Sequence, residues 1–265
     1  MYGKPIPPRL LRGATPAERP FLVPPLENRS FQPRRVWQLM REIRQDPSQT
    51  DKAFEMFDAI GGKGDDGLFQ SFAATEEGQR LLAERPDLPG LLADRSALGA
   101  MAPGSFGRAY LDFARENGFA ADSLLQTRDS VLDELDADLD PHRELFFDRL
   151  TVMHDLWHVL TSYGTDRAGE ITLLGFSWAQ GMRSRAFAIF GVVGATMGGF
   201  QLQRAMWQAL RRGQRANALA VARYEELLLL PIEDVRTRLR IAPVFVSHPE
   251  GVLRHQDDAL VRVAA

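Results

Sequence analysis

Cysteine is absent from the 265 residues of this chain. Its absence excludes disulfide bonds, thiolate ligands for zinc, iron–sulfur clusters and cysteine nucleophiles. A metal ion could therefore be held only by histidine and carboxylate side chains.

Long hydrophobic runs are also lacking. The longest uncharged apolar stretch extends from Ala186 to Phe200 and as a helix would reach about 22 Å, whereas the hydrocarbon core of a bilayer is about 30 Å thick. We therefore expect no transmembrane helix. The N-terminus lacks the apolar core of a signal peptide, and its prolines and acidic residues do not suit a transit helix, so we expect a bacterial-type cytoplasmic protein.

A strong net charge is missing as well. The chain has 32 basic and 35 acidic side chains and a formal net charge of -3. No overall field attracts nucleic acid, and we expect no nucleic-acid partner. The hydrophobic content of 45% is typical of a globular protein with a sizeable core.

Sustained alternation of apolar and polar residues is absent, and apolar residues recur at helical spacing instead. Examples are Val36, Leu39, Met40 and Ile43; Ala53, Phe54, Phe57 and Ile60; and Phe106, Tyr110 and Phe113. We predict an all-α fold with a single helical domain from residue 35 to 241. Half of the 16 prolines precede residue 36, so residues 1–34 are expected to form a proline/arginine-rich extended arm and residues 242–265 an irregular tail.

Two of the five histidines lie in the segment His154-Asp155-Leu156-Trp157-His158. On a helix, His154 and His158 share a face, and Asp155 lies about 100° round from His154. All three side chains could point into one space. Because the rest of the circumference is apolar, this polar stripe differs from an ordinary solvated helix face, which usually carries Lys, Arg or Glu.

The segment that follows carries one carboxylate. From Glu170 to Met182 the sequence is apolar nearly all round, which predicts a buried helix with Glu170 as its only charge. The intervening turn should fold this helix back and bring Glu170 toward His154 and His158. Burying an ionised carboxylate costs several kcal/mol unless a cation or good hydrogen bonds replace the water. Two imidazoles with one or two carboxylates suit zinc, or iron(II) if positions stay open, with magnesium as a further alternative.

Two plainer interpretations remain open. The histidines could be a surface pair with Asp155 as a salt partner. Glu170 could be a first-turn carboxylate that complements the helix dipole behind a cap at Thr165 or Asp166, worth about 0.3–1 kcal/mol.

The spacing His154-Asp155-x-x-His158, then eleven residues, then Glu170 resembles the HDxxH(x11)E signature of the coenzyme Q biosynthesis protein four family. The segment Pro103–Tyr110 is similar to the family's P-x-T-F-G-x-x-Y element, and Tyr224-Glu225-Glu226 with Leu239-Arg240-Ile241 resembles its C-terminal helix and ending. The resemblance covers roughly residues 80 to 241. The segment from Met182 to Arg212 and the two ends of the chain depart from it.

The resemblance implies an all-helical fold and a zinc-type site at His154, Asp155, His158 and Glu170. It also implies peripheral association with the inner membrane surface and a polyprenylated quinone precursor as ligand. The family's activity is oxidative decarboxylation, in which hydroxyl replaces the ring carboxylate, and eukaryotic members organise other ubiquinone biosynthesis enzymes into a complex.

The stretch from Ala186 to Phe200 interleaves glycines with large apolar residues. Such a pattern could line a groove for a prenyl tail, enter the membrane interface, or allow close helix packing in a homodimer. The remaining residues that could carry chemistry are interpreted as core, solvated or structural: Arg108, Tyr110, Glu225, Glu226, His142, His248 and His255.

Three functions compete at this stage. The first is a metalloenzyme acting on a prenylated 4-hydroxybenzoate derivative, with Asp155 as ligand or base and Glu170 as a second catalytic carboxylate. The second is a non-catalytic lipid-binding scaffold for ubiquinone biosynthetic enzymes, with a structural metal. The third is a hydrolase, which fits poorly because Asp155 is one carbon shorter than the glutamate of the HExxH proteases.

Overall fold

The computed structural model describes residues 30–45, 52, 55–56, 59–61, 66–118, 140–197, 199–254 and 259–261. Its elements are α1 (Pro33–Gln45), α3 (Asp66–Ala73), α4 (Glu76–Glu84), α5 (Leu88–Ala93), α6 (Arg95–Ala100), α7 (Phe106–Asn117), α9 (Pro141–Thr161), α10 (Arg167–Ala179), α11 (Arg185–Met197), α12 (Gly199–Arg215), the short helix η1 (Leu219–Val221), α13 (Tyr224–Leu227), α14 (Ile232–Arg238), α15 (Val244–Ser247), β1 (Val252–Arg254) and β2 (Ala259–Val261). The predicted all-α fold is confirmed, and the arm predicted for residues 1–34 lies mostly outside the described residues.

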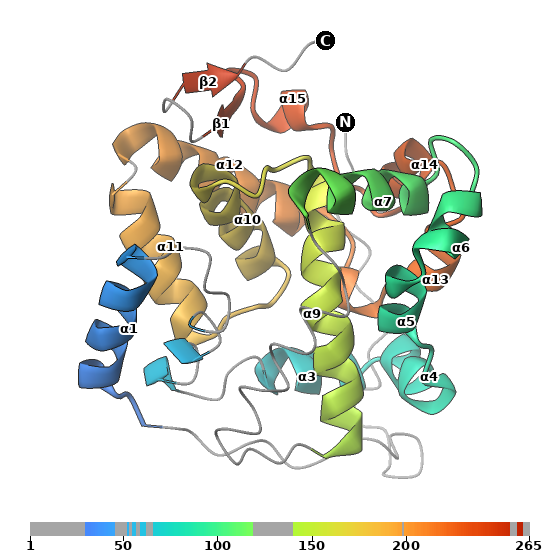
Figure 1. Ribbon diagram of the computed structural model, residues 1–265, viewed down its shortest axis with the longest axis horizontal. Coiled ribbons are helices and arrows are strands. Elements are labelled where there is room, and N and C mark those ends of the chain that lie inside the picture. The colour runs from blue at the N-terminus through green and yellow to red at the C-terminus, as the bar shows by residue number, and fades with distance from the viewer. Residues whose placement is uncertain are drawn as a thin grey trace.

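The long helix α9 occupies the middle of the molecule (Figure 1). Helices α4, α5 and α7 pack on it from one side, and α10 packs on it from the other, backed by α12. Its side chains Phe146, Leu156 and Trp157 are buried, and Trp157 Nε1 donates to the Tyr224 hydroxyl at 2.8 Å. The central helix is therefore tied directly to the C-terminal part of the chain.

Side-chain caps explain where several helices begin. A Ser, Thr or Asp precedes each of these helices and accepts backbone N–H groups of the first turn, which have no partner within the helix. The capping residues are Thr75, Asp87, Asp94, Ser105, Asp140 and Asp166.

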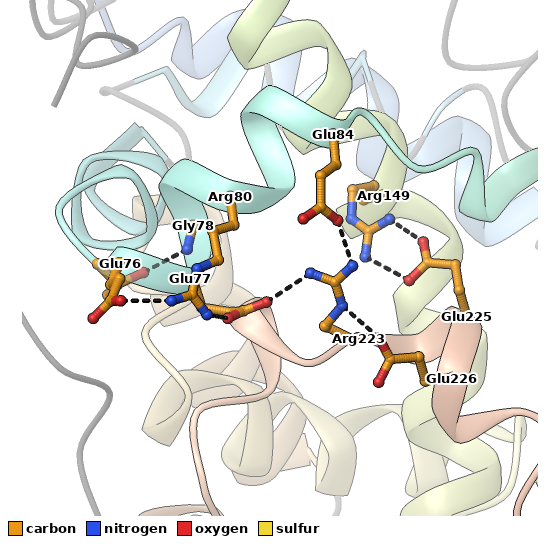
Figure 2. Close-up of polar contacts among 10 residues, drawn as sticks. Glu76, Glu77, Gly78, Arg80, Glu84, Arg149, Arg223, Glu225 and Glu226 are labelled. Carbon is orange, nitrogen blue, oxygen red and sulfur yellow. Dashed lines mark hydrogen bonds and ion pairs between the residues drawn. The ribbon is translucent and has the colours of Figure 1, made fainter. Parts of the chain in front are cut away.

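An ion pair joins α9 to α13. The guanidinium of Arg149 is nearly fully buried and contacts both carboxylate oxygens of Glu225 (Figure 2). It also donates to the Pro86 carbonyl at 3.2 Å. The prediction of a solvated face is therefore wrong for Glu225, because a buried arginine needs a carboxylate partner. This role also accounts for Glu225 without a metal.

Arg223 lies beside that pair and links α4 to α13. It contacts three carboxylates: Glu77 at 3.0 Å, Glu226 at 2.8 Å, and Glu84 (Figure 2). Exposed pairs of this kind contribute at most about 1 kcal/mol each, and more when they form a network. The network connects the exposed face of α4 to the start of α13, and Glu226 is one of its carboxylates.

The C-terminal tail differs from the irregular segment that was expected. It contains α15, and strands β1 and β2 pair antiparallel with Val252 opposite Val261. The regular structure of the tail arises from its packing on the helices, because the tail has no core of its own. In the part of the chain that the structure describes, no helix is long and apolar enough to cross a membrane.

His248 anchors this tail to α12. The residue is 1% exposed, and its Nε2 donates to the Ala205 carbonyl at 3.3 Å. The ring of Tyr163 lies edge-on with its centroid 5.4 Å away. Burial, with the positive charge of Arg212 as the next cause, lowers the pKa of His248 to about 4. The folded protein therefore holds this imidazole neutral.

Stability should fall in mild acid because of His248. Its pKa in the folded state is lower than in the unfolded state, so protonation favours unfolding. The contribution of the neutral His248 to the free energy of unfolding is complete above about pH 6.5 and is lost as the pH falls toward 4. At pH 5 the free energy of unfolding should be lower by about 2 kcal/mol. Urea unfolding at pH 7.5 and pH 5 measures this loss. His248→Gln, which keeps a donor for Ala205, should lose clearly less, and an equal loss in both proteins would contradict the assignment.

Candidate metal centre

The last two turns of α9 carry the histidine pair. His154 and His158 are four residues apart, and their Nε2 atoms lie 3.1 Å from each other. The rings meet edge to face, with centroids 4.8 Å apart and planes at 84°. The predicted shared face of these histidines is confirmed. Because His158 is only 1% exposed in its side chain, the interpretation as a surface pair is wrong for this residue.

A tight reversal joins α9 to α10. It starts at Ser162, which has a left-handed backbone with φ 61°, and ends at the Asp166 cap of α10. A Cβ added to Gly169 would lie 2.0 Å from the carbonyl oxygen of Gly164. Only glycine therefore permits the first turn of α10 to approach the chain so closely.

The reversal brings the carboxylate of Glu170 to the histidines. Its Oε1 lies 3.2 Å from His158 Nε2, and its Oε2 lies 3.4 Å from His154 Nε2. One ligand atom from each of the three residues can be chosen so that all lie within 4.8 Å of one another. The convergence predicted for His154, His158 and Glu170 is thus present.

Asp155 is not part of this group of three. Its side chain is buried, because the rotation of about 100° per residue turns it away from the face that His154 and His158 share. Burial raises the pKa of Asp155, the two histidines lower it, and Glu170 raises it further. The carboxyl group therefore lies close enough to interact electrostatically with His154, His158 and Glu170. The role of Asp155 as a metal ligand stays a prediction.

The site opens to solvent on one side. The side chains of His154 and Glu170 are 35% and 41% exposed. The expectation that Glu170 is deeply buried is wrong, because Glu170 lies in the first turn of α10, at the end of the helix rather than along its packed middle. The case for a cation site therefore depends on the convergence of donor atoms and not on a buried charge.

Electrostatics within the group favour an ionised carboxylate. Burial opposes ionisation of Glu170, but hydrogen bonds from His154 and His158 outweigh it and lower the pKa to about 2. Burial likewise opposes protonation of His154, and the hydrogen bond to Glu170 outweighs it and raises the pKa of this histidine. Without a metal ion, the carboxylate is neutralised by histidine protons, which a cation would displace.

The orientation of His158 is set by contacts that the sequence did not suggest. Its Nδ1 lies 3.2 Å from the backbone carbonyl of Tyr163. The ring of Phe113 from α7 stacks on the imidazole, with centroids 5.8 Å apart and planes at 20°. A backbone carbonyl leaves no trace in a sequence motif, and the sequence shows for Phe113 only its helical spacing with Phe106 and Tyr110.

The donor set suits a transition-metal ion. Two imidazole nitrogens and one carboxylate are typical ligands of catalytic zinc and of non-haem iron(II), and such sites keep further positions open. The exposed side of the group leaves room for those positions. The residues present therefore fit a divalent metal bound by three protein ligands.

One protein family matches most of this chain. The profile of the family "Coenzyme Q (ubiquinone) biosynthesis protein Coq4" matches residues 45–244. The chain is 27% identical over 205 residues to a mitochondrial ubiquinone biosynthesis protein COQ4 homolog from Anopheles gambiae, covering 74% of this chain and 68% of that one. A homolog from Drosophila ananassae is 26% identical over 205 residues, covering 74% and 72%.

A crystal structure of a protein from Nostoc punctiforme PCC 73102 also aligns, with 18% identity, coverage of 80% of this chain and 99% of that one, and a TM-score of 0.47. This likeness is too distant to support an argument. The family match spans most of the chain and includes all three residues of the metal group, so the chain belongs to the coenzyme Q (ubiquinone) biosynthesis protein Coq4 family.

Proposed function

We propose that this ubiquinone biosynthesis protein binds one divalent metal ion through His154, His158 and Glu170, with zinc as the first choice and iron(II) or magnesium as alternatives. The site acts on a polyprenylated benzoquinone precursor and supports replacement of the ring carboxylate by hydroxyl. The observation that carries this proposal is the convergence of the three ligand atoms on a partly open side of the protein. The family match supports a role in ubiquinone biosynthesis, and the precursor and its decarboxylation are what the resemblance of the HDxxH(x11)E motif implies.

The roles of the residues follow from their positions. His158, held by Tyr163, and His154 supply neutral nitrogen ligands, and Glu170 supplies negative charge. A bound metal ion would polarise a phenol or carboxylate oxygen of the ring. Asp155, which is buried and has a raised pKa, would hold or move a proton beside the site. Because the chain has no cysteine, an oxidative step would draw electrons through the metal, oxygen or a partner protein.

The alternative is a non-catalytic scaffold in which the metal is structural and the protein presents lipid intermediates to other ubiquinone biosynthesis enzymes. The partial exposure of His154 and Glu170 favours the enzyme, because structural zinc sites are usually closed by four protein ligands.

Metal content is the first test. The purified protein should contain about one divalent metal ion per chain, and His154→Ala and His158→Ala should each remove it while helix content by circular dichroism is kept. His142→Ala, in the first turn of the same helix, is the matched control and should keep the metal. Elemental analysis measures this. A full metal content in the double mutant lacking both histidines would exclude the site.

Turnover is the second test, and it separates enzyme from scaffold. Glu170→Gln should reduce single-turnover loss of the ring carboxylate far more than it reduces binding of a prenylated 4-hydroxybenzoate derivative, because charge at the metal matters most in the transition state. Zinc-loaded and iron-loaded proteins are compared under oxygen and under argon. If neither form releases carbon dioxide while the ligand binds and partner enzymes are stimulated, the scaffold function replaces the enzyme.

A membrane surface is the partner that we propose for the face formed by α11 and α12, which α1 adjoins. No Asp or Glu occurs between Glu170 and Glu225, whereas arginines occur throughout this part of the chain. On α12, Phe200 is 78% and Trp207 53% exposed, and the guanidinium of Arg211 lies 5.2 Å from the Trp207 ring. Exposed aromatics among arginines suit the interface of an anionic bilayer. A prenyl groove was one of the alternatives expected for Ala186–Phe200. Phe190 and residues 193–198 lie outside the described side chains, whereas Ile189 and Val192 are exposed.

Vesicle binding tests this face. Phe200→Ser combined with Trp207→Ser should reduce co-sedimentation with vesicles containing anionic phospholipid by about tenfold, and neutral vesicles should bind the unaltered protein weakly. Leu229→Ser is the control, because Leu229 is also exposed, at 62%, but lies between α13 and α14. Equal vesicle binding by the double mutant and the unaltered protein would contradict the membrane face. If light scattering without lipid shows that the unaltered protein is a dimer and the double mutant a monomer, the face is a homodimer interface instead.

A further inference from the structure

Two helices of this chain carry the same eight-residue pattern, Arg-x-x-Trp-Gln-x-Met/Leu-Arg. On a helix, the two arginines, the tryptophan and the Met or Leu share one face, and the residue after glutamine lies on the opposite face. The two segments are Arg34-Arg35-Val36-Trp37-Gln38-Leu39-Met40-Arg41 in α1 and Arg204-Ala205-Met206-Trp207-Gln208-Ala209-Leu210-Arg211 in α12.

The pattern forms the same kind of surface in both places. Trp37 is 58% exposed and Trp207 is 53% exposed. The guanidinium of Arg41 lies 4.9 Å from the Trp37 ring, and that of Arg211 lies 5.2 Å from the Trp207 ring. These distances allow a cation–π interaction in each helix. Both helices therefore present to solvent a tryptophan with an arginine one turn later.

Packing of α1 on the rest of the protein does not require this surface. Leu39 is fully buried in a small cluster that includes Ala186 of α11. On the opposite face Trp37 is joined by Met40, which is 48% exposed, and Phe31 just before the helix is exposed as well. Single exposed apolar side chains are ordinary on a protein surface, but a group of large ones on one helix indicates an interaction site.

Helix α1 lies on the side of the molecule that carries α11 and α12 (Figure 1). The cluster around Leu39 joins α1 to the start of α11, and α11 packs against α12. The family match begins at residue 45, where α1 ends. The match therefore does not account for the exposed face of α1.

The charge of α1 indicates the chemistry of its partner. Its sequence contains four arginines and one acidic residue, Glu42. Arg35 pairs with Glu55, whereas Arg34 and Arg41 lie on the face of Trp37. A basic and aromatic helix face suits a surface of anionic phospholipid. A second copy of the chain would bring arginines against arginines, so charge disfavours a homodimer through this face.

We infer that α1 is a second membrane-contact helix, in which Trp37 and Met40 enter the headgroup region of an anionic bilayer and its arginines face the phosphates. Tryptophan and arginine suit this region because the apolar part of each side chain enters the acyl boundary while the polar end stays hydrated. The inference rests on the membrane partner proposed for α11 and α12, and it adds a contact made by residues that this proposal does not use.

Tryptophan fluorescence with brominated lipid tests the contact directly. The chain has four tryptophans, of which Trp157 is buried in the core. In the full chain carrying Trp178→Phe and Trp207→Phe, Trp37 is therefore the only exposed tryptophan, and Trp157 gives a constant reference. On vesicles of phosphatidylcholine and phosphatidylglycerol, bromine on the acyl chains should quench the Trp37 emission. Adding Trp37→Phe to this variant should abolish the quenching.

Vesicle affinity, measured by co-sedimentation, is the second readout. Trp37→Ser combined with Met40→Ser should weaken binding to the same vesicles about tenfold, because both apolar side chains lose their burial in the interface. Gln38→Ser, exposed on the same helix at the edge of the Trp37 face, is the matched control and should bind like the unaltered protein. All these variants keep Leu39, so α1 should stay packed, and the melting temperature verifies this.

The outcomes separate α1 from α12. If Trp37 is not quenched and its double variant binds normally, while Phe200→Ser with Trp207→Ser loses binding, the inference is overturned and the α12 face stands. If Phe200→Ser with Trp207→Ser leaves both the vesicle affinity and the quenching of Trp37 unchanged, the α12 face fails and the contact of α1 stands.

Two further results would overturn the inference. If light scattering without lipid shows that the unaltered protein is a dimer and the Trp37→Ser, Met40→Ser variant a monomer, the exposed face of α1 is an interface between copies of the chain. If no form of the protein binds anionic vesicles, the membrane contacts of α1 and of α12 both fail.

Discussion

The site depends on one constraint, the reversal of the chain between α9 and α10. Metal ligands on a single helix can supply only one edge of a coordination sphere, and the third ligand must come from another element. Here the contact between Gly164 and Gly169 lets α10 begin close against the end of α9. Glu170 then falls beside both histidines. A side chain at Gly169 would push the first turn of α10 away and carry the carboxylate with it.

The C-terminal part of the chain supports this reversal rather than forming a separate layer. Arg212 and Arg236 donate to the carbonyls at the end of α9, and Trp157, the residue before His158, donates to the Tyr224 hydroxyl. His248 ties the tail to α12 beside Tyr163. The candidate site and the fold therefore share their interactions, and loss of the tail should loosen His154, His158 and Glu170 as well as the core.

Much of this arrangement could be predicted from the sequence, because local rules govern it. The spacing of His154 and His158 determines a shared helical face, and the short turn after them implies that Glu170 returns. What failed depended on tertiary contacts. The burial of Glu170 was overestimated, because apolar periodicity does not reveal which end of a helix is open. The sequence predicts a solvated Glu225, because its partner Arg149 lies far away in sequence. The carbonyl of Tyr163 that orients His158 has no signal in residue types.

The central claim is that His154, His158 and Glu170 bind one metal ion together. Anomalous diffraction from crystals of the zinc-loaded protein, collected on either side of the zinc absorption edge, tests it most directly. The account predicts one peak that disappears below the edge and lies about 2.0–2.2 Å from His154 Nε2, His158 Nε2 and a Glu170 oxygen. A peak bound by other residues, or a site in which Glu170 still pairs with both histidines and no metal is present, would contradict it.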